Sequence, residues 1–265
     1  YYMNNKLALI VGINYTDSNY ELRGCINDAV NIRDHLKKLD YKEIKMLTDD
    51  GINPTKENIL KELNYLIDQS KNYSELFFHY SGHGTGIRDN NNDEDDSRDE
   101  VLIPVDFREK GYITDDQINQ IIRKINPNCK LTMLFDCCHS GTIADMQYQT
   151  QKPGHFTVEN DHVINAKILM YSGCTDKQVS ADAYNIKNQK KWSGAMTSSF
   201  IHATTPYLKT NVGCFTVLQR MRTFINSKGY TQIPQLSSSV NFNKDLDLIG
   251  PDAYLNNKEH PQAQQ

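Results

Sequence analysis

The chain has 265 residues, which is enough for one large or two small α/β domains with a substantial core. The net charge of −4 and the pI near 6.1 argue against nucleic acid or an anionic membrane as a main partner. Six cysteines without a C-x-x-C pair are too few for a disulfide scaffold. No signal peptide or membrane-spanning apolar run is recognisable, so a cytoplasmic location is expected.

Short apolar runs alternate with stretches of helical periodicity along the chain. The runs predict buried strands at Leu7–Ile13, Ile44–Thr48, Leu76–Gly82, Leu131–Cys137 and Lys167–Gly173. The periodic stretches predict helices at Asn27–Leu39, Thr55–Ser70, Thr114–Ile125, Ala195–Leu208 and Thr216–Ser227. Thr55 and Thr114 are expected as N-caps. This alternation predicts a doubly wound α/β fold with a mostly parallel sheet.

One stretch, 147–162, lacks periodicity and contains Pro153 and Gly154, so it is predicted to be a linker. It would join a larger first region, 1–146, to a smaller second region, 163–255, within a single domain. The polar tail, 256–265, is predicted to be disordered.

Polar residues gather where two predicted strands end. The sequence HYSGHG (79–84) ends the third strand, and DCCHSG (136–141) ends the fourth. Ligands bind beyond the carboxyl ends of the strands in an open parallel sheet. Side chains alternate along a strand, so Ser81, His83, Asp136 and Cys138 are expected to share one side of the site. The same alternation turns Cys137 into the core.

Cys138 and His83 have the chemistry of a nucleophile and its base, because a thiolate needs an imidazole or a cation nearby. We assign His83 as the base that later protonates the leaving amine. Backbone N–H groups of Gly84 and Cys138 are predicted to hold the oxyanion. A phosphatase loop would need an arginine soon after its cysteine, and a nucleophile elbow would need flanking glycines. The sequence around Cys138 has neither.

Further motifs follow one another in a fixed order. They are GCINDA (24–29), LIPVDF (102–107), ITDDQI (113–118), GAMTSSF (194–200) and QIPQLSSS (232–239). Together with HYSGHG and DCCHSG, they make the chain resemble a type I metacaspase from about Lys6 to Leu248. The resemblance implies a caspase-like (caspase–hemoglobinase) fold with a p20-like region at 1–146 and a p10-like region at 163–255. It also implies a cysteine endopeptidase that is a monomer.

The resemblance places the substrate pocket of the family at Cys25, Asp28, Ser81 and Asp136. Two carboxylates in one pocket suit a cationic side chain, because a buried arginine or lysine must be paired. Metacaspases cleave after Arg or Lys, so we expect protein or peptide substrates with a basic P1 residue.

Acidic residues crowd the segment 89–100, but Glu94 stands where an EF-hand loop needs glycine, so we reject an EF-hand. The resemblance instead implies calcium ligands that are dispersed in the sequence. They are Asp99, Asp115, Asp116 and Asp145. A Ca²⁺ ion beside the Cys138 loop would order that loop, which predicts activation by calcium.

Metacaspases also cleave themselves after basic residues, and Lys190 or Lys191 is the candidate site here. A role for these lysines as plain surface residues stays open. Two alternatives for the whole chain also stay open. One is a non-catalytic caspase-fold module that binds calcium and partners, and the other is a legumain-like or clostripain-like peptidase.

Overall fold

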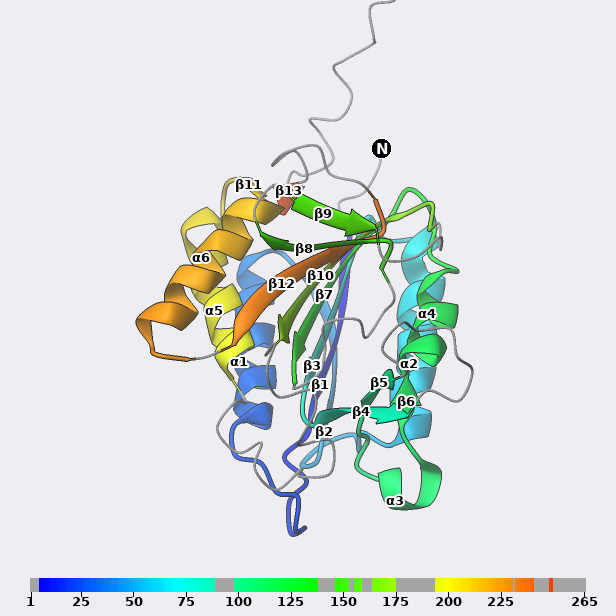
Figure 1. The fold of residues 1–265 in the computed structure, drawn as a ribbon. Coiled ribbons are helices and arrows are strands. Elements are labelled where there is room, and N and C mark those ends of the chain that lie inside the picture. The colour runs from blue at the N-terminus through cyan, green and yellow to red at the C-terminus, as the bar shows by residue number, and fades with distance from the viewer. Residues whose placement is uncertain are drawn as a thin grey trace, which may run out of the picture.

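The computed structural model describes residues 5–88, 98–137, 146–152, 155–158, 164–174, 194–230, 232–240 and 248–249. An eight-stranded sheet with the order β2-β1-β3-β7-β10-β12-β8-β9 forms the centre of the molecule (Figure 1). Its strands are β1 (Lys6–Gly12), β2 (Glu43–Thr48), β3 (Glu75–Ser81), β7 (Lys130–Asp136), β8 (Tyr148–Lys152), β9 (His155–Val158), β10 (Lys167–Cys174) and β12 (Ile233–Ser238). The five strands from β2 to β10 are parallel, and β12, β8 and β9 add to them in antiparallel pairs. The predicted mostly parallel sheet is confirmed.

Helices cover both faces of this sheet (Figure 1). On one face lie α1 (Cys25–Lys38), α5 (Ala195–Thr204) and α6 (Cys214–Ser227), and on the other lie α2 (Lys56–Asp68) and α4 (Asp115–Ile122). The remaining elements are the short helix α3 (Phe107–Lys110), the 3₁₀ turns Gln69–Lys71 and Thr205–Tyr207, a sheet of β4 (Gly84–Arg88), β5 (Arg98–Leu102) and β6 (Ile113–Thr114), and the pair β11 (Val212–Gly213) and β13 (Leu248–Ile249).

Alternation along the strands divides the core into two apolar clusters, one on each face of the sheet. Neighbouring residues of β1 belong to different clusters: Leu9 packs with residues of α2 and α4, and Ile10 packs with residues of α1, α5 and α6. Cys137 is buried in the first cluster together with Met133 and Phe135. The prediction that Cys137 turns into the core is therefore confirmed.

Both predicted N-caps are present. Thr55 Oγ1 accepts a hydrogen bond from Asn58 N at 3.1 Å, and Thr114 Oγ1 accepts one from Gln117 N at 3.3 Å. The Gln117 side chain in turn accepts from Thr114 N, which completes a capping box. This cap fixes the start of α4 and thereby the position of its first-turn aspartates.

The stretch predicted as a linker, 147–162, differs from that expectation because it contains two strands of the main sheet. β8 and β9 form a hairpin, and β8 pairs with β12. The sequence of β8, YQTQK, has no apolar alternation to predict a strand. Its place depends instead on backbone pairing and on a buried amide pair, in which Gln149 Nε2 donates to Gln235 Oε1 at 2.9 Å.

A buried ion cluster joins the amino-terminal ends of the three central strands. Lys6, Glu75 and Lys130 are register partners on β1, β3 and β7. Glu75 lies 3.4 Å from Lys6 Nζ and 3.3 Å from Lys130 Nζ, and it also accepts the Tyr41 hydroxyl. Burial lowers the pKa of Lys6, while Glu75 opposes this change. The cluster stabilises the register of the strands at the end away from their carboxyl termini.

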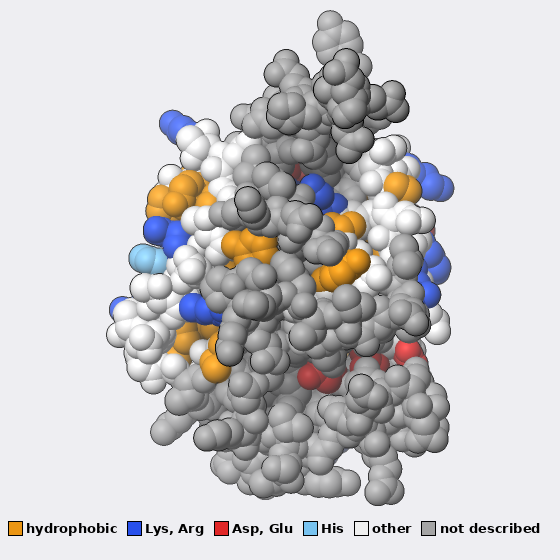
Figure 2. Space-filling view, turned by 45° about the horizontal axis from the view of Figure 1, so that its top comes forward, with side chains coloured by type: hydrophobic (Ala, Val, Ile, Leu, Met, Phe, Trp, Pro, Cys, Tyr) orange, Lys and Arg blue, Asp and Glu red, His pale blue; other side chains and the backbone are white. Residues whose placement is uncertain are grey.

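No helix in the described part of the chain is long and apolar enough to cross a membrane. On the face that Figure 2 shows, the described Lys and Arg side chains are scattered rather than gathered in one patch.

Candidate active site

The candidate site lies at the carboxyl ends of β3 and β7, near the bottom of Figure 1. Ser81 and Asp136 are register partners at these two ends, and α1 packs close to them. Gly12 allows this approach, because a Cβ atom there would lie 2.6 Å from Cys25 O and 2.8 Å from Ala29 Cβ. A side chain at position 12 would push away the first turn of α1, which carries the other two pocket residues.

The four predicted pocket residues, Cys25, Asp28, Ser81 and Asp136, converge in the structure. The Ser81 hydroxyl donates to Asp28 Oδ2 at 3.0 Å, and it lies close enough to the Cys25 thiol to lower the pKa of that thiol. The Asp136 carboxylate is close enough to Asp28 to raise its pKa. All four side chains are buried.

The two carboxyl groups are not equivalent. Burial raises the pKa of Asp28, and the negative charge of Asp136 raises it further. Burial also raises the pKa of Asp136, but hydrogen bonds from Thr197 and from backbone N–H groups oppose this rise. Asp136 is therefore the better stabilised anion, and Asp28 carries the proton when no cation is near. Burial also raises the pKa of the Cys25 thiol to about 12, so this thiol is neutral and is not a nucleophile.

The amino terminus of α5 contacts Asp136, and the sequence did not predict this contact. Thr197 N donates to Asp136 Oδ2 at 2.7 Å, and backbone N–H groups of Gly194 and Met196 also interact with this carboxylate. Gly194 has φ 95°, and a Cβ atom there would lie 3.1 Å from Asp28 Oδ1. The motif GAMTSSF could have indicated this contact. A glycine directly precedes the helix and supplies no side-chain cap, so the first N–H groups of the helix need an acceptor from elsewhere.

His83 is buried and is held by contacts with the segment after β1. Its Nε2 lies 2.8 Å from Tyr20 O. A carbonyl only accepts, so Nε2 carries the proton, and Nδ1 carries the lone pair of the neutral ring. The Tyr15 ring packs against the imidazole with centroids 4.7 Å apart. The Tyr15 hydroxyl accepts from His83 N at 2.9 Å and donates to Ile103 O at 2.6 Å.

Several predicted site residues lie outside the described part of the chain. Cys138 and Asp145 lie outside it, as do Lys190 and Lys191, and so does the side chain of Asp99. Two neighbours of the predicted catalytic pair are described: Gly84 begins β4 directly after His83, and Cys137 follows Asp136.

Two of the predicted calcium ligands lie in the first turn of α4. The buried Asp115 accepts Glu100 N through Oδ2 at 3.0 Å and Asp116 N through Oδ1 at 2.8 Å. Asp99 precedes Glu100 on β5, so its backbone lies beside the same turn. The described residues hold no group of three or more His, Cys, Asp or Glu side chains that could bind a metal.

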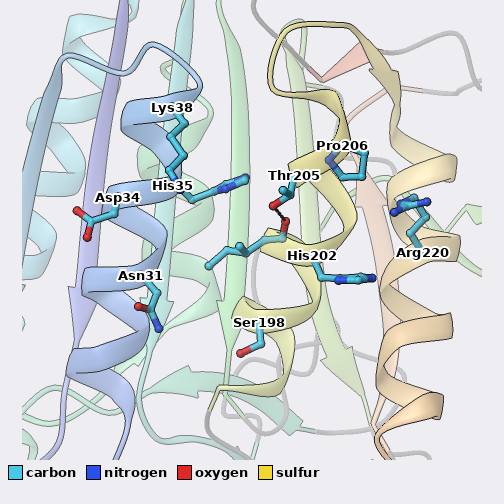
Figure 3. Close-up of a pocket in the computed structure, with 10 residues that line it drawn as sticks. Asn31, Asp34, His35, Lys38, Ser198, His202, Thr205, Pro206 and Arg220 are labelled. Carbon is cyan, nitrogen blue, oxygen red and sulfur yellow. Dashed lines mark hydrogen bonds between the residues drawn. The ribbon is translucent and has the colours of Figure 1, made fainter.

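A separate hollow of about 570 Å³ lies among α1, α5 and α6 (Figure 3). Several of its polar side chains already have partners, among them Arg220 and His202. Arg220 donates to Ala203 O at 3.1 Å, and the His202 ring packs on Phe224 with centroids 4.7 Å apart. None of the predicted site residues lines this hollow, so it is distinct from the pocket at the strand ends.

Comparison with solved structures identifies the class of fold. The chain aligns with protein GSU0716 from Geobacter sulfurreducens at a TM-score of 0.63 and 19% identity, over 91% of this chain and 95% of the other. It aligns with the Drosophila initiator caspase Dronc at a TM-score of 0.51 and 13% identity, over 89% and 80% of the two chains. The expected caspase-like fold is thereby confirmed.

Sequence comparison identifies the family. A model described as "Metacaspase, peptidase C14 domain" matches residues 6–147. Metacaspase-1 of Meyerozyma guilliermondii is 37% identical over 88% of this chain and 69% of its own length. Metacaspase-1 of Debaryomyces hansenii is 36% identical over 92% and 67% of the two lengths. The chain belongs to the metacaspase family and is a cysteine-type peptidase.

Proposed function

We propose that this peptidase is a calcium-activated endopeptidase that cleaves after Arg or Lys, with Cys138 as nucleophile and His83 as base. The preference for a basic P1 residue is supported by one observation above all. Asp28 and Asp136 are buried side by side, and Asp136 Oδ1 has no hydrogen-bond partner among the described residues. The ion pairs of the described residues include neither carboxylate.

Buried carboxylates without a cation are costly, and a guanidinium or ammonium group from a substrate would remove this cost. Asp136 supplies the fixed negative charge of the pocket. Asp28 would release its proton when the cation enters, and Ser81 orients it. An aspartate side chain at P1 would meet two acidic groups here, so caspase-like specificity is disfavoured.

The proposed chemistry begins when His83 Nδ1 takes the proton of the Cys138 thiol, and the sulfur attacks the scissile carbonyl carbon. The N–H groups of Gly84 and Cys138 stabilise the oxyanion. His83 then protonates the leaving amine, and water hydrolyses the thioester. The hydrogen bond from Nε2 to Tyr20 O supports this assignment, because it orients the ring and leaves Nδ1 as the basic nitrogen.

The proposed calcium site consists of Asp99, Asp115, Asp116 and Asp145. These hard oxygen donors fit Ca²⁺, and α4 and β5 bring the backbone of Asp99 near Asp115 and Asp116. Bound calcium would supply a positive charge that orders the acidic segments around it. We also propose self-cleavage after Lys190 or Lys191, a monomeric state and a cytoplasmic location.

Hydrolysis of matched peptides with P1 Arg, Lys or Asp, with and without Ca²⁺, tests this function. We expect rapid cleavage of the Arg and Lys peptides with Ca²⁺ and none by Cys138→Ala. Faster cleavage of the Asp peptide would contradict the pocket assignment. Titration with a thiol-specific reagent checks that Cys138 is a reactive thiol, which a non-catalytic module would not need.

A further inference from the structure

Thr197 on α5 is bonded to two side chains of the central sheet. Its backbone N–H donates to Asp136 Oδ2 at 2.7 Å. Its hydroxyl oxygen lies 2.9 Å from His79 Nε2. Thr197 and His79 are both buried, so water does not replace these bonds. One threonine therefore joins the pocket carboxylate to a histidine below it on β3.

The direction of these hydrogen bonds follows from the chemistry of the three groups. The Thr197 backbone N–H donates to the Asp136 carboxylate, which only accepts, and His79 Nε2–H donates to the Thr197 hydroxyl oxygen. Burial lowers the pKa of His79 to about 3, which keeps the ring neutral. His79 Nδ1 has no partner among the described residues, and as a bare acceptor it is less costly than a buried bare N–H would be. His79 thus holds the Thr197 side chain, and the backbone N–H of the same residue holds Asp136.

We propose that Thr197 and His79 are positioning residues that hold Asp136 as an oriented carboxylate for the basic P1 side chain of the substrate. This inference rests on the proposed function of the pocket. Donors that bond one oxygen of Asp136 fix the carboxylate and leave Oδ1 for the substrate cation. Neither residue touches the reacting atoms, so loss of the Thr197 hydroxyl should weaken substrate binding more than it slows the chemical step.

The helix α5 offers a matched control two turns further along. His35 Nε2 lies 2.7 Å from Thr204 Oγ1, and both residues are buried (Figure 3 shows His35 directed toward α5). The Thr204 hydroxyl donates to Phe200 O at 2.7 Å, a carbonyl of its own helix. The pair His35–Thr204 therefore has the same chemistry as His79–Thr197 but bonds no pocket carboxylate.

The test compares Thr197→Val, which keeps the shape but loses the hydroxyl, with Thr197→Ser and with Thr204→Val. Steady-state kinetics on a P1 Arg peptide and thermal unfolding are measured for each variant. We expect Thr197→Val to raise KM about tenfold with little change in kcat, because the hydrogen bond from His79 that holds Thr197 beside Asp136 is lost. Thr197→Ser should restore KM, and Thr204→Val should lower the melting temperature with KM unchanged.

An unchanged KM in Thr197→Val, or an equal rise in Thr204→Val, overturns the inference. Asp136→Asn is measured in parallel to separate this failure from failure of the proposed function. If Asp136→Asn raises KM and Thr197→Val does not, the pocket assignment holds and only the positioning role is wrong. If Asp136→Asn leaves KM unchanged, the pocket assignment itself is wrong.

Discussion

Ser81 and Asp136 are register partners on adjacent strands, yet each is bonded to a different helix. Ser81 donates to Asp28 on α1, and Asp136 accepts from the amino terminus of α5. The cluster is therefore assembled from distant parts of the chain: one carboxyl group lies on α1, the other ends β7, and α5 supplies a backbone N–H. Its carboxylates can be tested separately.

We expect Asp136→Asn to lower kcat/KM for P1 Arg peptides by about 100-fold or more, since the substrate cation would lose its main buried counter-charge. Steady-state kinetics on P1 Arg and P1 Lys peptides measure this loss. Asp34→Asn is a matched control, because Asp34 lies on the exposed side of α1 and pairs with Arg33. A loss of similar size in the control would mean that net charge, rather than the pocket, is responsible.

Asp28→Asn should make the protein more stable and less active. The raised pKa of Asp28 means that the folded protein retains a proton that the unfolded chain releases near pH 4. Stability is therefore lost as pH rises from about 4 through the raised pKa, and an asparagine does not have this cost. Above that range we expect a gain of at least about 1 kcal/mol, or roughly 2–4 °C in Tm.

Calorimetry of the wild type and Asp28→Asn between pH 5 and 9 measures this effect. The difference in Tm should increase with pH, and kcat/KM for P1 Arg peptides should fall in the variant. A Tm difference that is constant across this range would show that the pKa of Asp28 is not raised in the folded protein.

Tyr15→Phe should impair the positioning of His83. The substitution removes the acceptor for His83 N and leaves a buried N–H without that partner, at a cost of about 1–3 kcal/mol. We expect a lower Tm and a lower kcat, with KM for P1 Arg peptides changed little. Tyr65→Phe, at an exposed tyrosine on α2, is the control. Wild-type kcat in Tyr15→Phe would exclude the proposed role of the hydroxyl.

Calcium removal and substitution of Asp115 test the proposed metal site. Chelation with EDTA should abolish most of the peptidase activity, and added Ca²⁺ should restore it. Asp115→Asn keeps one oxygen that can accept Glu100 N, but it loses a ligand charge and the acceptor for Asp116 N, so its Tm is measured beside its activity. We expect it to raise the Ca²⁺ concentration for half-maximal activity at least about tenfold. Asp68→Asn on α2 is the control for a change in surface charge, and full activity in EDTA would refute the site.

Glu75→Gln tests the ion cluster at the other end of the sheet. It leaves Lys6 and Lys130 buried without their shared counter-charge, so urea unfolding should show a loss of about 3–5 kcal/mol. Lys130→Met should cost less, because Glu75 keeps its pairing with Lys6. The kcat/KM of the folded protein should match that of the wild type in both variants, since the cluster is remote from the pocket.

The sequence predicted the strands, helices and caps that are determined by residues close together in the chain. The five central strands are apolar runs, and the caps at Thr55 and Thr114 are polar residues directly before periodic stretches, so each could be identified from its neighbours alone. The shared face of Ser81 and Asp136 could also be predicted from strand parity, whereas Asp28, on a helix, was indicated only by the resemblance to metacaspases.

The remaining features depend on contacts between distant segments. Tyr15 and Tyr20 contact His83 only because the segment after β1 folds across the end of β3. Thr197 reaches Asp136 because α5 packs against the end of β7. The strand β8 carries no apolar alternation, since pairing with β12 rather than burial of one face determines its place.

The order of strands at the far edge of the sheet has a consequence for the proposed self-cleavage. The strand β12 comes after Lys190 and Lys191 in the sequence, yet it pairs on one side with β10 and on the other with β8, which both precede them. Cleavage at either lysine would therefore leave the carboxyl-terminal fragment inserted between two strands of the amino-terminal one. The nicked enzyme would remain a single two-chain particle, with its pocket still closed by α5.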